Sequence, residues 1–365
     1  MNKKNNIFGT FAKLWSNYSY IFVFLLILVV YALVISNNGQ HFNSGHISTI
    51  LASQYTVIVG TIALGMSLVI ITGQIDLSVG STLVITTASA IIGYNISGGN
   101  PLVMVVAALF SGFICGLING IFVGLAKMPP FIVTLGTMLI YRSLALSFVN
   151  IKFSDFAEKA GIAAGQFKLL NTFDSYELVR MQFGSGSLKL LGFKIPYITI
   201  LFVLITILFI ILTQNTKYGK SVYAVGSNEK AARLTGINVT GVKMSVFILT
   251  GLLVGVAGVM QACKMSNVNP ASSGQSYEMY AIASVVLGGV SMSGGRGKLL
   301  GVLFGAMSYC TVNTIIAISG LPITLQDTFQ GIVLIVVILI QTVSPIIKEK
   351  IDHYRKRKLN EKGGN

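Results

Sequence analysis

Charged residues are scarce in this chain. They make up 10% of its 365 residues, with only 11 acidic side chains, whereas 53% of the residues are hydrophobic. A soluble domain carries about 25% charged residues, so the chain lacks the polar surface that a water-soluble body of this length needs. Apolar runs of about 18 residues or more recur along the sequence, and each can cross about 30 Å of hydrocarbon. The composition therefore predicts a protein embedded in a lipid bilayer.

Metal-binding, disulfide and nucleotide motifs are also missing. The chain has three cysteines and three histidines, and their spacing matches neither a disulfide framework nor a recognisable metal-ligand set. Segment 290–301 reads VSMSGGRGKLLG, but a phosphate-binding loop needs Ser or Thr after Gly-Lys, and here Leu299 follows Lys298. We therefore expect no ATP site, no metal, no cofactor and no catalytic residues in this chain.

The apolar runs predict an all-α integral membrane protein of about ten transmembrane helices, some of them broken or short. The second and third predicted spans nearly touch, and the eighth is short. The domain boundaries that follow are an N-terminal segment 1–19, a membrane domain 20–345 and a basic tail 346–365. The predicted spans are 20–36, 48–72, 77–95, 101–126, 130–149, 196–213, 242–262, 278–290, 298–319 and 322–344.

Positive charge predicts the orientation. The formal net charge is +15, and its placement in short segments between apolar runs is typical of a topology signal rather than a nucleic-acid surface. With both termini in the cytoplasm, 18 of the 26 Lys and Arg residues lie on the inner side. Most of the others lie in the long outer segment 150–195, and long loops influence orientation weakly. That outer segment could hold a short helix or hairpin.

The inner segment 214–241 contains a predicted short helix. Ser227 and Asn228 are suitable caps for Glu229–Leu234, whose good helix formers end before Gly236. A passive connector is the alternative, but long ordered connectors in compact proteins are usually functional. We interpret the segment as a docking element on the inner membrane face.

The predicted spans also contain a regular pattern of glycines. Glycines recur every fourth residue on one helix face, which allows a neighbouring backbone to approach closely; they are Gly112, Gly116, Gly120 and Gly124.

Acidic residues at membrane depth are costly and are functional candidates by default; the three in or beside spans are Asp76, Glu278 and Asp327. Asp76 lies between Gly73 and Gly80, where Asp76 and Ser78 could cap the next helix. This break could be a tight cytoplasmic turn or part of a gate. Glu278 could cap a helix near the outer face or meet an arginine on a docking partner.

Four stretches resemble a known family. TGQIDLSVGS (72–81), PPFIVTLGTM (129–138), YGKSVYAVGSNEKAARLTGINV (218–239) and YEMYAIASVVLGGVSMSGGRGKLLG (277–301) look like the permease subunits of bacterial monosaccharide ABC importers. Within the ribose, xylose and galactose group of that family, the ribose permease is the most similar. The resemblance covers roughly residues 45–345, and the outer segment 150–195 looks longer here.

The resemblance implies a homodimer in the bacterial cytoplasmic membrane, with the translocation path at the dimer interface. Partner ATPase subunits would bind ATP and Mg²⁺ and dock on the inner side, and an external sugar-binding protein would dock outside at a surface that includes Glu278. The implied path or gate residues are Asp76, Leu77, Ser78, Gly80 and Ser81. The implied ATPase-coupling residues are Ser227, Asn228, Glu229, Lys230, Ala231, Arg233, Leu234 and Gly236.

Other functions are compatible with parts of the sequence. An ion-coupled secondary transporter would use Asp76 or Glu278 as its coupling carboxylate, but it has no need for the inner docking segment. A membrane scaffold would explain the glycines but not the four matched stretches. Within the ABC class, a permease for nucleosides or branched-chain amino acids is the alternative.

Overall fold

The protein is a helical membrane protein, as the sequence predicts. The computed structural model describes residues 3–149, 154–163, 165–190, 192–320, 322, 325, 328–332, 335, 336 and 339. Within these residues, seven helices are long and apolar enough to cross a membrane, and an eighth span results if the bent pair Ser44–Ala52 and Tyr55–Ile71 counts as one. The fold class is confirmed, whereas the predicted count of ten spans is not established.

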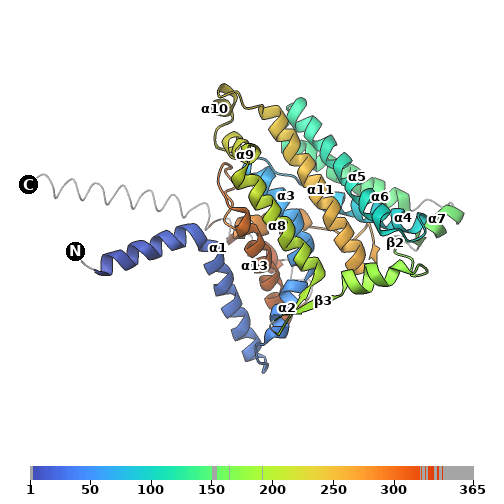
Figure 1. The fold of residues 1–365 in the computed structure, drawn as a ribbon, viewed down its shortest axis with the longest axis horizontal. Coiled ribbons are helices and arrows are strands. Elements are labelled where there is room, and N and C mark those ends of the chain that lie inside the picture. Colours follow the sequence, from blue (N-terminus) through green and yellow to red (C-terminus); the bar gives the residue numbers. More distant parts are fainter. Residues whose placement is uncertain are drawn as a thin grey trace, which may run out of the picture. The chain divides into compact units, whose positions relative to one another are not determined.

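The elements follow one another along the chain (Figure 1). The first half contains α1 (Lys3–Asn37), α2 (Ser44–Ala52), η1 (Tyr55–Val59), α3 (Gly60–Ile71), α4 (Val79–Ile96), α5 (Pro101–Gly120), η2 (Ile121–Leu125), α6 (Pro130–Val149) and α7 (Ser154–Ala160). The second half contains β1 (Ile162–Ala163), β2 (Gln166–Lys168), η3 (Glu177–Gly184), β3 (Ser187–Leu190), β4 (Phe193–Pro196), α8 (Tyr197–Asn215), α9 (Lys217–Ser227), α10 (Glu229–Leu234), α11 (Val239–Met265), β5 (Asn267–Val268), α12 (Tyr277–Leu287) and α13 (Leu299–Ile318). The elements labelled η are short turns of π-helix.

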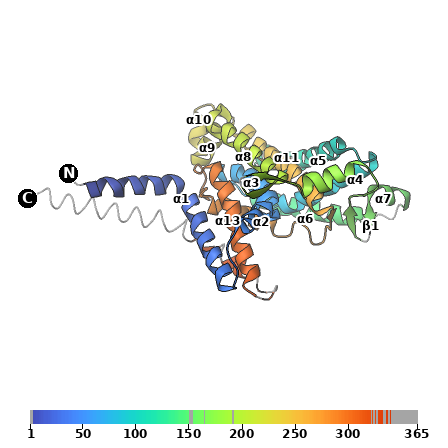
Figure 2. The ribbon, with the colours of Figure 1, turned by 60° about the horizontal axis from the view of Figure 1, so that its bottom comes forward.

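Several predicted spans differ in detail from the observed helices. The second bends by 51° between α2 and η1, and α1 bends at Tyr18, where the backbone leaves the helical region (Figure 2). The 11 residues of α12 rise only about 17 Å, which is too short to cross the bilayer. The predicted span 322–344 lies mostly outside the described residues, and Asp327 and the basic tail lie wholly outside them.

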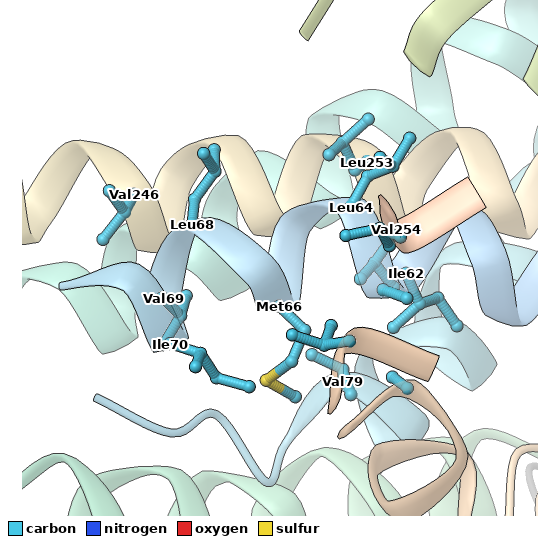
Figure 3. Close-up of a cluster of buried hydrophobic side chains, with 14 of the residues drawn as sticks. Ile62, Leu64, Met66, Leu68, Val69, Ile70, Val79, Val246, Leu253 and Val254 are labelled. Atoms are coloured by element: carbon cyan, nitrogen blue, oxygen red, sulfur yellow. The ribbon is translucent and has the colours of Figure 1, made fainter. Parts of the chain in front are cut away.

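Helix α3 lies at the centre of the bundle. All twelve of its residues are buried, which is the behaviour of a helix that is apolar on every side. Figure 3 shows Leu64 and Leu68 of α3 beside α11, and Met66 of α3 close to Val79 of α4. The segment that follows α3, residues 72–78, is therefore anchored on the most buried helix of the protein.

Helices α5 and α11 pack at close range along their length, because glycines remove the side chains between them. A methyl group at Gly112 would overlap the carbonyl of Gly251, and one at Gly116 would overlap that of Phe247. One turn further, Gly120 faces Met244. The glycine face of α5 is thus the surface that packs against α11.

The outer segment 150–195 is partly ordered by two small sheets. Strands β1, β2 and β5 form an antiparallel sheet, and β3 pairs with β4. The side chain of Asn95, at the end of α4, donates to the carbonyls of Ala160 and Lys168 and accepts from the amide of Leu170. This buried amide fixes the segment to the bundle.

The α5–α11 contact predicts a difference between two glycine substitutions. Gly112→Ala should destabilise the protein by about 1–3 kcal/mol, because two backbones must separate to admit a methyl group. Gly136→Ala on α6 is the matched control, since nothing lies within 4 Å of its added Cβ and alanine favours a helix. Thermal unfolding in the same detergent tests this, and equal stability of the two variants would contradict the packing argument.

Candidate functional site

The short helix α10 lies at one end of the bundle and is capped at both ends. The side chain of Asn228 accepts from the amide of Ala231 at 3.0 Å, and Gly236, just past the helix, has a positive φ of 83°. Ser227 is not a cap of α10, because it is the last residue of a separate helix, α9. Figure 1 shows α9 and α10 at the end of the bundle opposite α2 and β3.

Glu229 fixes α10 to the rest of the protein. Its carboxylate pairs with Lys243 of α11 at 2.7 Å and with Arg233 of its own helix at 3.3 Å. The hydrogen bond from Lys243 is the main reason that the pKa of Glu229 lies below its ordinary value, and the positive charges of Lys243 and Arg233 add to it. The predicted coupling residue Glu229 is therefore engaged within the chain.

The other predicted coupling residues present an open surface. Ala232 is the buried contact of α10, whereas Ser227, Asn228, Lys230, Ala231, Arg233, Leu234 and Gly236 are exposed. Leu234 has 89% of its surface exposed, which is unusual for an apolar residue on a well-capped helix beside positive charges. Such a surface suits a partner that offers an apolar pocket rimmed by acidic groups.

A cavity of about 290 Å³ lies beside α10, where this helix meets the membrane helices. Its lining combines Glu229, Arg233 and Lys243 with the α5–α6 connection, including Lys127 and Pro129. Gln74, from the segment after α3, also lines it. Both polar atoms of the Gln74 side chain are buried without a hydrogen-bond partner. Two predicted coupling residues, Glu229 and Arg233, thus share a cavity with Gln74, which lies two residues before the predicted gate residue Asp76.

The break between α3 and α4 is held by a buried polar cluster. Asp76 is 3% exposed, and its Oδ1 accepts from the amide of Ser78 at 2.8 Å and from its hydroxyl at 2.6 Å. The side-chain amide of Asn119 on α5 donates to that hydroxyl at 2.8 Å. Ser78 occupies the N-cap position of α4, but its side chain does not cap the helix. Among the described residues, no basic group forms an ion pair with Asp76.

Helices α4 and α12 meet where each one begins. A methyl group on Gly80 would overlap the carbonyl of Gly274 and the carboxylate of Glu278, so the backbones are in close contact. The guanidinium of Arg142 on α6 donates to the carbonyls of Pro270 and Ser273, in the segment that precedes α12. Glu278 is therefore half-buried against α4 rather than fully exposed.

The remaining predicted gate residues belong to the same region. Gly80 and Ser81 are buried, as is Ser78, while Leu77 is half-buried. The hydroxyl of Ser81 has no hydrogen-bond partner. The structure thus brings the predicted gate segment 76–81 and Glu278 together. The predicted coupling segment Ser227–Gly236 is not in this cluster, and it lies at the other side of the cavity that Gln74 lines. Sequence reasoning missed Asn119, Arg142 and the pairing of Lys243, which come from distant helices and carry no local signal.

These features define the class of the protein. It is a multi-pass bundle with broken helices, a buried polar break and an exposed helix at one end, which is an organisation typical of a membrane transport subunit.

Comparison with known proteins identifies the family. The model of the permease component of branched-chain amino acid transport systems matches residues 48–338. The ribose import permease RbsC of Bacillus subtilis is 36% identical over 77% of this chain and 80% of its own, and RbsC of Escherichia coli K12 is 33% identical over 90% and 95%. The xylose transport permease XylH of Haemophilus influenzae is 30% identical over 88% and 96%. This chain therefore belongs to that family of ABC transporter permeases, and it is a transport subunit rather than an enzyme. No solved structure matches the chain.

The Glu229–Lys243 pair predicts a pH-dependent difference between the wild type and Glu229→Gln. Because the pKa of Glu229 in the folded state is lowered from about 4.5, its contribution is complete above that value and is lost as the pH falls through the lowered pKa. Amide hydrogen exchange in α10 should be faster in Glu229→Gln at neutral pH, and the two proteins should converge as the pH falls through the lowered pKa of Glu229. A difference that persists unchanged at low pH would contradict this assignment.

Proposed function

We propose that this chain is the membrane-spanning subunit of an ATP-driven importer for a monosaccharide, ribose or a related sugar. The relatives named as ribose and xylose permeases align with most of the chain, and this observation carries the proposal. A separate ATPase binds ATP and Mg²⁺ and docks on α10. An external binding protein delivers the sugar. Two copies of this chain form a dimer, and the translocation path runs along their interface.

The geometry supports a route for the motion. A partner that grips Leu234 and the positive charges of α10 moves a helix whose Glu229 is tied to α11 by Lys243. The cavity beside Glu229 is bounded by the α5–α6 connection and by Gln74, so displacement of α10 changes the space next to the break at residues 72–78. Alternating access then follows from movement of the start of α4 against α12.

The same end of the protein is the proposed cytoplasmic side. Lys298 lies over the ring of Tyr18 at 5.3 Å, and Tyr20 and Tyr223 of α9 line one cavity with Arg296 and Lys298. The first span therefore begins on the side that carries α9, and these positive charges agree with the inner side of a membrane. We propose that both termini are cytoplasmic.

The energy source separates this proposal from an ion-coupled transporter that uses Asp76 or Glu278. Cells that express the chain with its ATPase and binding protein should keep importing labelled ribose or xylose after a protonophore collapses the ion gradient. Depleting ATP should stop the import, because the proposed energy source is ATP hydrolysis by the separate ATPase. Loss of import with the gradient, at unchanged ATP, would favour the ion-coupled transporter.

Truncating Leu234 should weaken binding of the ATPase. An exposed apolar residue that becomes buried in an interface is worth about 1–2 kcal/mol or more, so Leu234→Ala should lower the affinity about five- to thirtyfold. Copurification from mild detergent and a titration with the purified ATPase measure this. Leu178→Ala is the control, because Leu178 is also an exposed leucine but lies in the outer segment 150–195. Equal binding by both variants would place the docking surface elsewhere.

A further inference from the structure

A second cavity lies at the end of the bundle opposite α10. It has a volume of about 330 Å³ and opens beside the end of α11. The 27 residues of α11 span about 40 Å, which separates this cavity from the coupling helix by the thickness of the membrane. Amide and aromatic side chains dominate its lining, chiefly Gln54, Tyr55, Gln261, Asn267, Gln275 and Tyr280.

Irregular backbone surrounds this cavity. The second span bends by 51° next to Gln54, where Tyr55 begins a turn of π-helix. Ser266 and Ser276, at the two ends of the segment that joins α11 to α12, both have a φ of 61°. Backbone of this kind is tolerated at membrane depth only where it is buried in protein or lines a cavity. Strained residues and π-turns also concentrate at functional sites.

Gln261 supplies an unused hydrogen-bonding group. Its side chain is 5% exposed, and its amide oxygen is buried without a partner. A buried acceptor without a donor costs about 1–3 kcal/mol, so its place on a span that is otherwise apolar requires an explanation. A ligand that carries a hydroxyl donor would satisfy it.

Tyrosine rings form one wall. Tyr55, Tyr277 and Tyr280 line the cavity and contact one another, with ring centroids 5.8 Å apart for Tyr55 and Tyr280. Tyr309 packs behind them, with its ring centroid 5.2 Å from that of Tyr280. Such rings combine an apolar face with a polar hydroxyl. A sugar presents the matching surface, since its C–H groups pack on a ring while its hydroxyls bond to amides.

The residues that line the cavity are uncharged, and this limits the class of ligand that the cavity can bind. None of the residues that line this cavity is charged, so nothing in it would balance the carboxylate and ammonium of an amino acid. The volume lies near the lower limit of about 300–1,000 Å³ for ligand pockets, which fits a single small ring. These properties favour an uncharged, compact polyol.

We propose that this cavity is a monosaccharide-binding site within one subunit, occupied as sugar enters the membrane domain. This inference rests on the proposed import function and adds the residues that contact the sugar. Gly274 links the site to the break, because it lines the cavity while its carbonyl faces Gly80 at the start of α4. Movement at the break would therefore change the cavity.

Binding of a sugar in the cavity can be tested by whether the sugar protects an introduced cysteine from a thiol reagent. In the full chain in lipid nanodiscs, Gln275→Cys places a reactive group at the exposed edge of the cavity, while the three native cysteines are buried. Saturating ribose, xylose or galactose should slow its reaction with a small charged maleimide at least threefold. Lys220→Cys on α9 should be unaffected, since it lies at the other end of the bundle.

Additional variants test which side chains bind the sugar. Gln261→Leu in the Gln275→Cys background should raise the half-protecting sugar concentration about three- to tenfold, the cost of one hydrogen bond, whereas Gln182→Leu at an exposed position should not. Tyr55→Phe should act in the same direction as Gln261→Leu, and it provides a second test if Gln261→Leu fails to fold.

Two outcomes would overturn the inference. If no sugar protects the thiol while proteoliposomes with the complete complex import a sugar, the path avoids this cavity and the proposed function stands. If leucine or uridine protects the thiol and sugars do not, the ligand class is wrong, and the proposed substrate fails with it.

Discussion

Backbone hydrogen bonding in lipid is the constraint on which the rest of this structure depends. A polar backbone group exposed to hydrocarbon costs several kcal/mol, so spans should be continuous helices. This chain interrupts its helices after Ile71, next to Gln54 and between Ser266 and Ser276. Several of its buried polar side chains lie there: Asp76 and Asn119 at the first interruption and Gln261 near the others. These three side chains thus lie close to positions where the chain departs from regular helix.

Close backbone packing compensates for these interruptions. The glycines of α5 let it approach α11 along about two and a half turns, and dispersion contacts over that length provide stability that lipid cannot replace. Helix α11 therefore serves as a stable reference element. Its first turns hold α10 through Lys243, and its last turns carry Gln261. The coupling surface and the proposed sugar cavity are attached to opposite ends of one rigid helix.

The sequence predicts the class of this fold well and its internal contacts poorly. Run length and scarcity of charge suffice to predict an all-α membrane protein, and the Asn228 cap and Gly236 bound α10 correctly because capping is a local interaction. The number of spans is harder, since α12 is as apolar as its neighbours but begins only after the irregular segment 267–276. Partners such as Asn119 for Ser78, Lys243 for Glu229 and Arg142 for the carbonyl of Ser273 come from distant parts of the chain. Lipid-facing and core-facing positions are both apolar, so periodicity does not indicate which faces meet.

The distribution of charge explains why one subunit could combine ATP-driven motion with an uncharged cargo. Positive charge lies on α10 and near Lys298, where a partner and the inner membrane surface can use it. At the opposite end, the lining of the proposed sugar cavity is free of charge. A charged group there would bind water or ions tightly and would have to be desolvated in each transport cycle. Amides and tyrosines bind a sugar through several weak bonds that can break one at a time, so the cargo leaves when the start of α4 moves against Gly274. Weak and distributed binding is what an importer needs if an external protein supplies the selectivity and a separate ATPase supplies the energy.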